Sequence, residues 1–297
     1  MLAAIELGGT KVNVAVGWPG EPFAARARIP TGEPEPTLAA IRDFFAEQVR
    51  HHGPLRGLGI GAFGPVVINP SDPAYGRLLP NPKPGWSGVD LLAALAGSTD
   101  GTVALTTDVG AAGIGEAEAG ALKGVACGVY VTIGTGIGAA IIVNGRPLPA
   151  LLHPEIGHLA LARRADDRSG CICRFHDSCA EGLLAGPSII ARFGQPLNAF
   201  APDGPEMALA ADYVGQLLAA IVLALSPQRI VVGGGVSQAP GLLVAARAAM
   251  VHALNGYVSH GLDAPDFILA PALGDDSGLE GALVLAADAL AHPQGAC

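Results

Sequence analysis

Residues 5–11 of this chain read Ile5-Glu6-Leu7-Gly8-Gly9-Thr10-Lys11, and they indicate a strand that ends in a glycine turn. After the turn, Val12, Val14 and Val16 alternate with other residues. A period of two is typical of a strand that buries one face. The sequence therefore predicts two strands within residues 2–17, joined by the turn at residues 8–11.

The same strand–turn–strand pattern returns later in the chain. An apolar run at residues 129–133 leads into Gly134-Thr135-Gly136-Ile137-Gly138, and a second apolar run follows at 139–143. Two copies of one pattern indicate two related α/β halves. We expect domains at residues 1–115 and 116–281, with a terminal helix at 282–297 that packs back on the first domain.

Strands and helices are expected to alternate along the rest of the chain. The predicted helices cover residues 37–50, 181–193, 206–225 and 240–254, and the further strands cover 58–62, 103–107, 229–232 and 267–269. Residues 69–88 are too rich in proline and glycine for regular structure. Such alternation indicates mostly parallel sheets that are covered on both faces.

Composition narrows the class of protein. The chain has 297 residues, of which half are hydrophobic and 14% are charged, and this excludes general disorder. Its net charge of −9 argues against binding to nucleic acid. The longest apolar run, at residues 217–225, is shorter than the roughly 18 residues that a membrane helix needs. We expect a cytoplasmic protein with neither nucleic-acid nor membrane partners.

A group of sulfur and imidazole side chains predicts a structural zinc site. Cys173, His176 and Cys179 follow the spacing C-x-x-H-x-x-C, and His158 is a natural fourth ligand. Four such ligands describe a closed tetrahedral zinc site. The alternatives are a disulfide between Cys173 and Cys179, or cysteines that only pack. Cys171 is a rival ligand, because the pair Cys171-x-Cys173 also suits chelation.

Two carboxylates, Glu155 and Glu181, flank the proposed zinc ligands. A zinc ion that fixes this polar loop would orient them to position a substrate rather than react with it.

Glycine turns after strands favour phosphate binding, because no Cβ blocks the approach to backbone N–H groups. Four turns fit, at residues 8–11, 134–138, 233–235 and 274–278. Thr10, Lys11, Thr132 and Thr135 add further donors. No P-loop and no dinucleotide fingerprint occurs. We expect a nucleotide gripped between two domains. The alternatives are ordinary tight turns and a solvated Lys11.

Asp108 follows the predicted strand at residues 103–107, at the end where open α/β sheets place ligands. A carboxylate there can accept a proton from an alcohol that attacks a phosphoryl group. The alternative is that Asp108 only caps the next helix.

Together these segments resemble the ROK sugar kinases, and most of all their fructokinase branch. The resemblance runs from Glu6 to Ala282. The segments that carry it are residues 5–11, Phe63-Gly64-Pro65-Val66, Pro82-Lys83-Pro84-Gly85-Trp86, Thr107-Asp108-Val109, residues 132–138, 153–158, 173–182, Gly186-Pro187, and Val232-Gly233-Gly234-Gly235-Val236.

The resemblance implies a two-domain actin-like ATPase (ribonuclease H-like) α/β fold with a zinc-pinned loop. It implies ATP-dependent phosphorylation of a hexose, D-fructose to fructose 6-phosphate, in a homodimer that uses Mg²⁺ and structural Zn²⁺. Mannose or glucose as substrate, and an inactive sugar sensor, are the alternatives. The implied site residues are the base Asp108; the sugar ligands Glu155, His158 and Glu181; the zinc ligands His158, Cys173, His176 and Cys179; and the nucleotide-binding residues Gly8, Gly9, Thr10, Lys11, Thr132, Gly134, Thr135, Gly136, Pro187, Gly233, Gly234 and Gly235. One departure is Gly110, where the family usually has an asparagine that binds the sugar.

Overall fold

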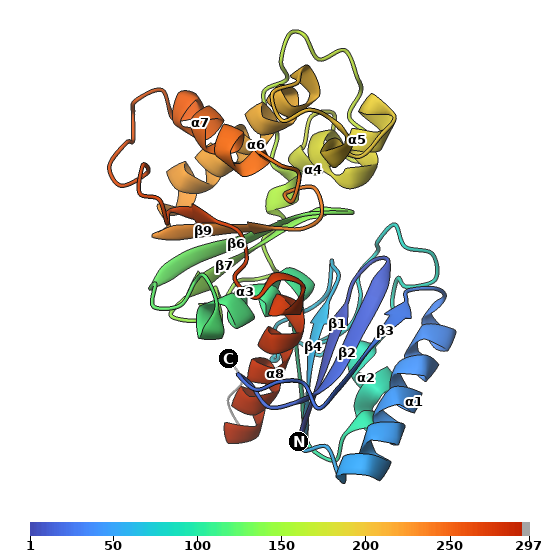
Figure 1. Ribbon diagram of the computed structural model, residues 1–297. Helices are drawn as coiled ribbons and strands as arrows, with labels where there is room; N and C mark the ends of the chain where they lie inside the picture. Colours follow the sequence, from blue (N-terminus) through green and yellow to red (C-terminus); the bar gives the residue numbers. More distant parts are fainter. Residues whose placement is uncertain (293–297) are drawn as a thin grey trace. The chain divides into compact units, whose positions relative to one another are not determined.

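The computed structural model describes residues 1–292 of the chain, which form two compact units (Figure 1). The first unit contains Met1–Gly124, Ala140–His153 and the segment that begins at Ala272. The second unit contains Val125–Ala139 and Pro154–Pro271. The expected boundary after residue 115 falls inside a helix of the first unit. Residues 293–297 of the expected terminal helix lie outside the described residues.

The first unit is built on a five-stranded sheet with the strand order β3-β2-β1-β4-β5. Its strands are β1 (Leu2–Leu7), β2 (Lys11–Gly17), β3 (Ala25–Pro30), β4 (Gly57–Ala62) and β5 (Thr102–Thr107). Strands β1, β4 and β5 are parallel, whereas β2 is antiparallel to both β1 and β3. The sheet is therefore mixed and not mostly parallel, because a short glycine turn can join β1 to β2 only as a hairpin.

Helices cover both faces of this sheet (Figure 1). The helices of the unit are α1 (Pro34–His52), α2 (Leu91–Leu95), the 3₁₀ turn η1 (Ala96–Ser98), α3 (Asp108–Ala119), the 3₁₀ turn η4 (Gly274–Asp276) and α8 (Ser277–Ala291). Ile5 and Leu7 of β1 pack in one buried cluster with Phe45 of α1. Leu2 and Ala4 of the same strand pack in another with α8. Alternate side chains of one strand thus reach opposite helical layers.

Helix α8 approaches its neighbours closely because glycines stand at the contacts. A Cβ added at Gly59 of β4 would lie 1.8 Å from the carbonyl oxygen of Ala282. A Cβ at Gly281 of α8 would lie 1.7 Å from the carbonyl oxygen of Ala111 in α3. Only glycine fits at these two positions.

The second sheet has the strand order β10-β9-β6-β7-β8. Its strands are β6 (Cys127–Ile133), β7 (Ile137–Val143), β8 (Arg146–Pro147), β9 (Arg229–Gly233) and β10 (Ile268–Leu269). The helices of the second unit are the 3₁₀ turn η2 (Ile156–His158), α4 (Ala180–Leu184), α5 (Gly186–Phe193), the 3₁₀ turn η3 (Leu197–Ala199), α6 (Pro205–Leu225) and α7 (Leu242–Leu254). The sequence predicted one helix over residues 181–193. The chain forms two, because Ala185 takes an extended ψ of 156° before Gly186 and Pro187.

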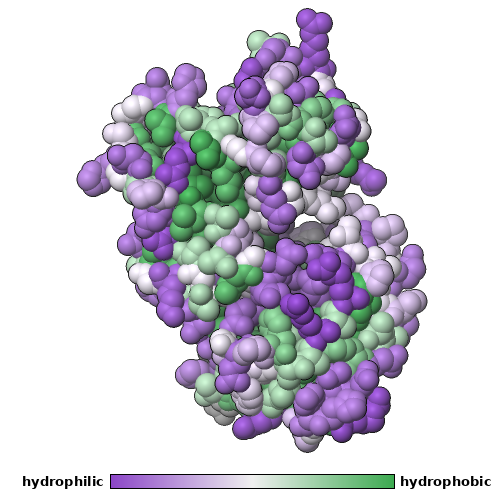
Figure 2. Space-filling view, viewed as in Figure 1, coloured by the Kyte–Doolittle hydropathy of each residue, from purple (hydrophilic) through white to green (hydrophobic). Residues whose placement is uncertain are grey.

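Helix α6 is the one helix among the described residues that is long and apolar enough to cross a membrane, by length and composition alone. Of its most apolar window, 56% is buried inside the protein. Its Val214, Leu217 and Leu218 belong to the core of the second unit. In Figure 2, further hydrophobic residues gather over the region where Figure 1 draws α6 and α7. Burial on this scale is typical of the core helix of a globular unit.

Candidate active site

Asp108 is the first residue of α3, directly after β5. The helix cap is its neighbour Thr107, whose Oγ1 accepts a hydrogen bond of 2.9 Å from the Gly110 N–H. The capping role that competed for Asp108 therefore belongs to Thr107. One oxygen of the Asp108 carboxylate accepts a 2.8 Å hydrogen bond from the Val109 N–H.

The environment of Asp108 raises the pKa of its carboxyl group. Burial raises the pKa of Asp108 to about 6, the hydrogen bond from Val109 opposes that rise, and the nearby Glu6 carboxylate adds to it. A carboxylate with a pKa near the operating pH is suited to take a proton from an alcohol. The geometry and the pKa of Asp108 therefore fit a general base.

Glu6 begins a chain of polar contacts across β1, β2 and β3. Its Oε2 accepts a 2.6 Å hydrogen bond from Nδ2 of Asn13, and Oδ1 of Asn13 accepts one of 3.2 Å from Nε of Arg28. Burial raises the pKa of Glu6, while Asn13 and Lys11 oppose that rise. A buried asparagine on a strand of valines was the signal in the sequence for this pair, and sequence reasoning missed it.

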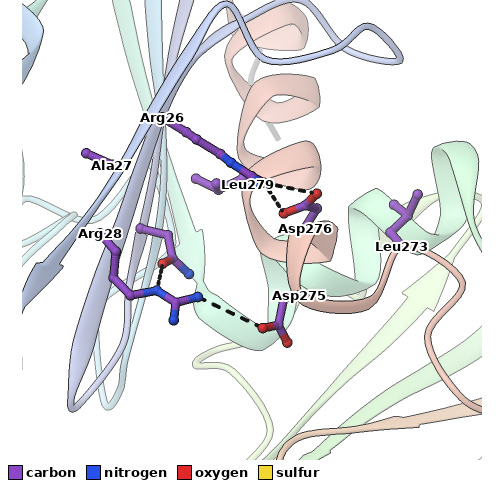
Figure 3. A pocket seen from close by; sticks show the side chains of 8 residues that line it. Arg26, Ala27, Arg28, Leu273, Asp275, Asp276 and Leu279 are labelled. Atoms are coloured by element: carbon purple, nitrogen blue, oxygen red, sulfur yellow. Dashed lines mark hydrogen bonds and ion pairs between the residues drawn. The ribbon is translucent and has the colours of Figure 1, made fainter.

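Beside this chain of contacts lies a polar groove of about 530 Å³ (Figure 3). Arg26 of β3 pairs with Asp276 at 3.2 Å, and Arg28 pairs with Asp275 at 4.0 Å. Both aspartates belong to the glycine turn at residues 274–278, which the sequence identified as a possible phosphate turn. Paired in this way, the two arginines are already balanced by carboxylates.

Three of the predicted nucleotide-binding segments meet in the second unit. The Gly134 carbonyl accepts a 2.7 Å hydrogen bond from the Gly186 N–H, at the start of α5 beside Pro187. Thr132 is the strand partner of Gly233. Gly234 has φ +90°, and a Cβ there would lie 2.5 Å from the Ile133 carbonyl oxygen. The segment at residues 132–136 thus lies between α5 and the turn at 233–235. The turn at residues 8–11, with Gly8, Gly9, Thr10 and Lys11, belongs to the first unit.

The predicted zinc ligands lie together. The donor atoms of His158, Cys173, His176 and Cys179 are all within 4.8 Å of one another. The Cys173 Sγ lies 3.5 Å from Nδ1 of His176 and 3.9 Å from Nδ1 of His158. Ligands on a tetrahedral zinc with ordinary bond lengths are separated by about 3.5 Å. The donor set and its spacing therefore fit zinc.

The disulfide that was an alternative to the zinc site is not formed between Cys173 and Cys179. Cys127, Cys171, Cys173 and Cys179 are all free thiols, so no disulfide links the pair in question. Cys171 is not part of the four-residue cluster. Its Sγ instead lies against the backbone of α4, only 2.0 Å from where a Cβ on Gly182 would be.

Glu181 connects the zinc cluster to the glycine turn of the second unit. Its Oε2 accepts a 2.9 Å hydrogen bond from the Ile137 N–H, and its Oε1 lies 3.9 Å from Nε2 of His158. His158 thus turns one ring nitrogen to the cluster and the other toward a carboxylate, as metal-binding histidines commonly do. Glu155, the other predicted sugar ligand, is exposed and precedes η2.

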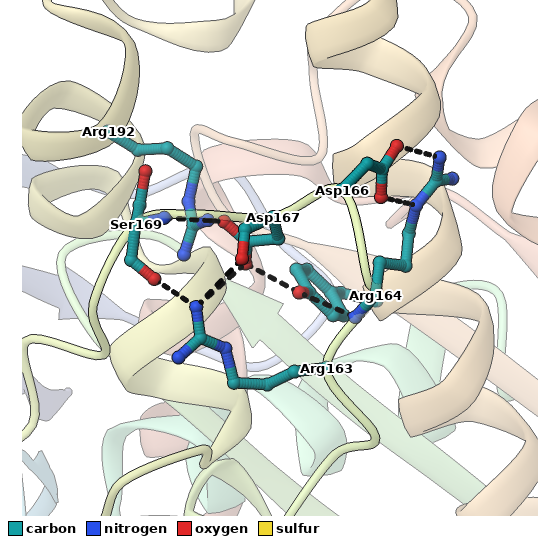
Figure 4. A network of polar contacts seen from close by, with 7 residues as sticks. Arg163, Arg164, Asp166, Asp167, Ser169 and Arg192 are labelled. Carbon is teal, nitrogen blue, oxygen red and sulfur yellow. Dashed lines mark hydrogen bonds and ion pairs between the residues drawn. The ribbon is translucent and has the colours of Figure 1, made fainter.

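A buried ion-pair network supports the loop that leads to the zinc ligands (Figure 4). Asp167 of this loop pairs with Arg192 of α5, and both side chains are at least 97% buried. The Tyr213 hydroxyl of α6 donates a 2.6 Å hydrogen bond to Asp167, and the Ser169 N–H donates one of 3.0 Å. Burial opposes ionisation of Asp167, but these donors hold its pKa below the ordinary value.

At Gly110, where the resemblance led us to expect an asparagine, a side chain would crowd two threonine hydroxyls. A Cβ there would lie 2.5 Å from Oγ1 of Thr106 and 2.9 Å from Oγ1 of Thr107. Two threonine hydroxyls therefore occupy the space beside this backbone position.

The chain matches the ROK family over residues 2–289. A fructokinase of Pediococcus pentosaceus is 38% identical over 98% of this chain and 99% of its own length. A fructokinase of Zymomonas mobilis subsp. mobilis is 36% identical over 95% of each chain.

Solved structures agree with the sequence comparison. A ROK hexokinase from Thermus thermophilus has a TM-score of 0.77 and 29% identity over 99% of each chain. A ROK glucokinase from Streptomyces griseus, solved with glucose and AMPPNP, has a TM-score of 0.74 at 23% identity, covering 97% of this chain and 99% of that one, and shows the fold alone. The predicted actin-like α/β fold and the predicted resemblance are both confirmed, and the chain belongs to the ROK family.

Proposed function

We propose that this protein is an ATP-dependent sugar kinase that converts D-fructose to fructose 6-phosphate. The observation that carries the proposal is Asp108, a carboxylate at the end of β5 whose pKa is raised to about 6. The choice of fructose as the sugar is supported by similarity to fructokinases, at 36–38% identity over nearly the whole chain.

Asp108 accepts the proton of the sugar hydroxyl as the hydroxyl oxygen bonds to the γ-phosphorus of ATP. The bond between that phosphorus and the β,γ-bridging oxygen breaks, and ADP leaves. Removing the proton makes the oxygen a stronger nucleophile, and positioning together with charge stabilisation supplies the rest of the catalysis.

The glycine turns offer backbone N–H groups to the phosphates. In the first unit, the N–H groups of Gly9 and Thr10 do so, and Gly8 and Lys11 belong to the same turn. In the second unit, the residues that contact the nucleotide in this proposal are Thr132, Gly134, Thr135, Gly136, Pro187, Gly233, Gly234 and Gly235. Mg²⁺, when bound, neutralises charge on the triphosphate. The oxygens of Glu6, beside the first turn, are donors of the kind that Mg²⁺ takes.

Glu155, His158 and Glu181 contact the sugar in this proposal. His158, Cys173, His176 and Cys179 hold a structural zinc ion that fixes the loop. A fixed carboxylate discriminates between epimers, because a misplaced hydroxyl leaves a buried acceptor without a partner, at a cost of about 1–3 kcal/mol.

A coupled ADP-release assay with fructose, mannose, glucose and N-acetylated hexosamines tests the proposal. We expect the highest kcat/KM for fructose and weaker activity on mannose or glucose. If kcat/KM is ten-fold higher for glucose than for fructose, glucose and not fructose is the substrate. If the protein binds sugar but does not phosphorylate it, the protein is a sugar sensor.

We also propose a cytoplasmic homodimer that binds neither nucleic acid nor membrane. Light scattering of the purified protein measures the mass of the assembly, and a monomer at micromolar concentration would contradict the dimer.

A further inference from the structure

Lys83 lies in the proline-rich segment at residues 81–86, far along the chain from the first glycine turn. Its ammonium donates a 2.7 Å hydrogen bond to the Gly9 carbonyl and one of 3.0 Å to the Thr31 carbonyl. These two hydrogen bonds to backbone carbonyls fix the Lys83 side chain in place. The side chain therefore belongs to the support of the turn at residues 8–11.

The segment that carries Lys83 is itself anchored. Trp86 is fully buried, and its Nε1 donates a 2.9 Å hydrogen bond to the Gly32 carbonyl. The Lys83 N–H donates a 3.0 Å hydrogen bond to Oδ1 of Asn81. Prolines on either side of Lys83 restrict the backbone further. The position of the ammonium is thus determined by the fold and not by a free side chain.

Every carbonyl of the turn is engaged. Oγ1 of Thr31 donates to the Gly8 carbonyl at 2.8 Å, and Nζ of Lys83 donates to the Gly9 carbonyl. The Thr31 N–H donates to the Thr10 carbonyl at 3.1 Å. The Lys11 carbonyl accepts from the Gly8 N–H at 3.0 Å.

The N–H groups of the turn are in the opposite situation. Those of Gly9 and Thr10 donate to no group among the described residues. A Cβ added at Gly9 would meet nothing within 4 Å, so the turn is open on that side. Two adjacent free N–H groups on an open glycine turn form an arrangement that suits an anion.

The planar peptide bond links these two observations. In a trans peptide the C=O and the following N–H point in opposite directions. Holding the Gly9 carbonyl on Lys83 therefore fixes the direction of the Thr10 N–H. Holding the Gly8 carbonyl on Thr31 fixes the Gly9 N–H in the same way.

We propose that Lys83 is a positioning residue for the phosphoryl donor. It orients the Thr10 N–H toward the phosphate chain of a nucleoside triphosphate and adds a positive charge beside the turn. An ammonium has three donors, and the third has no acceptor among the described residues. The inference rests on the proposed kinase function and adds to it a residue outside the glycine turns.

Lys83→Met tests this role, with Lys123→Met as the matched control. Lys123 is exposed in the segment between α3 and β6. For Lys83→Met we expect the KM for ATP and the dissociation constant of Mg-AMPPNP to rise about ten-fold or more, because a charge-assisted contact is lost. The KM for fructose should change less than about two-fold. Lys123→Met should match the wild type in all three.

Lys83→Arg separates charge from shape. It keeps the cation and its donors, and we expect it to bind Mg-AMPPNP more tightly than Lys83→Met does. If Lys83→Met does not fold, Lys83→Arg is measured in its place. We expect Lys83→Arg to bind Mg-AMPPNP less tightly than the wild type, because a planar guanidinium does not reproduce the two carbonyl contacts. If the dissociation constant of Mg-AMPPNP is the same as in the wild type for Lys83→Met, or for Lys83→Arg where Lys83→Met does not fold, the inference is overturned.

A rise confined to the KM for fructose would also overturn it, since the segment would then serve the sugar. Failure of the proposed function gives a different result: the wild type would phosphorylate no hexose. The Mg-AMPPNP measurement still tests Lys83 in that case, because it needs no sugar turnover.

Discussion

The turn at residues 8–11 in the first unit and the turn at residues 134–136 in the second follow the same strand–glycine–strand pattern, yet they are held differently. Side chains from other loops hold the first, through Thr31 and Lys83. Backbone of α5 holds the second at Gly134, and the Glu181 carboxylate accepts from the next strand.

The difference predicts which parts of the molecule would depend on the proposed zinc ion. The supports of the first turn are threonine and lysine donors. Glu181, in contrast, also faces His158 of the proposed zinc cluster. Loss of zinc should therefore disturb the second unit and leave the first turn and Asp108 intact. The predictions below test that separation.

The largest effect is expected at Asp108, in the first unit. Asp108→Asn keeps the size of the side chain but cannot accept the proton of the sugar hydroxyl. We expect kcat to fall about 10²–10⁴-fold while sugar binding, measured by calorimetry, and zinc content are retained. Near-normal turnover would exclude Asp108 as the base.

The stability of Asp108→Asn is the control for folding. The pKa of Asp108 in the folded protein is raised to about 6, so the folded state binds its proton more tightly than the unfolded state. Stability therefore falls as pH rises toward that value, and ionised Asp108 costs stability above it. The amide removes this cost, and the variant should melt at the same or a higher temperature at pH 8.

The second prediction concerns the zinc cluster. Cys173→Ser should lose the metal and lower kcat/KM at least about ten- to 100-fold, because the loop that orients Glu181 loosens. Cys171→Ser is the matched control and should keep about one zinc per chain. Elemental analysis of both variants decides between them. Loss of metal from the Cys171 variant alone would reverse the ligand assignment.

Most strands and most helices of both units could be predicted from the sequence, but β3 and the short β8 were missed. Alternation at Val12, Val14 and Val16 marks β2, because the buried face of a strand must be apolar at every second residue. The break between α4 and α5 was missed, although Gly186 and Pro187 were its signal.

The supports of the site could not be predicted in the same way. Lys83 bonds to Gly9 across 74 positions, and Arg192 pairs with Asp167 across 25. Such pairs depend on how irregular loops fold onto the sheet, and no periodicity encodes them. That His158, Cys173, His176 and Cys179 lie together was predictable, because they are close in sequence and follow a spacing typical of metal ligands.

The third prediction uses pH to distinguish the role of Asp108 in the first unit from that of the proposed zinc cluster in the second. Burial keeps the pKa of Asp108 at about 6, and the base must be ionised to act. We expect kcat/KM of the wild type to fall about ten-fold for each pH unit below that value. Zinc content measured at the same pH values is the control. Activity that stays level to pH 5 would contradict a base with this pKa.

The smallest effect is expected at Tyr213, which supports the zinc loop from α6. Tyr213→Phe removes the hydroxyl that donates to Asp167 at 2.6 Å and leaves the pairing of Asp167 with Arg192 in place. A hydrogen bond to a charged group contributes about 1.5–3 kcal/mol, so the free energy of unfolding should fall by about 2 kcal/mol. Because the low pKa of Asp167 depends partly on this donor, the loss of unfolding free energy should become smaller as pH falls through that pKa.

Denaturant unfolding at pH 7 and at pH 3 measures this loss and its dependence on pH. Mg-AMPPNP affinity should not change, and a variant with wild-type stability at pH 7 would show that the remaining donors are sufficient for the loop.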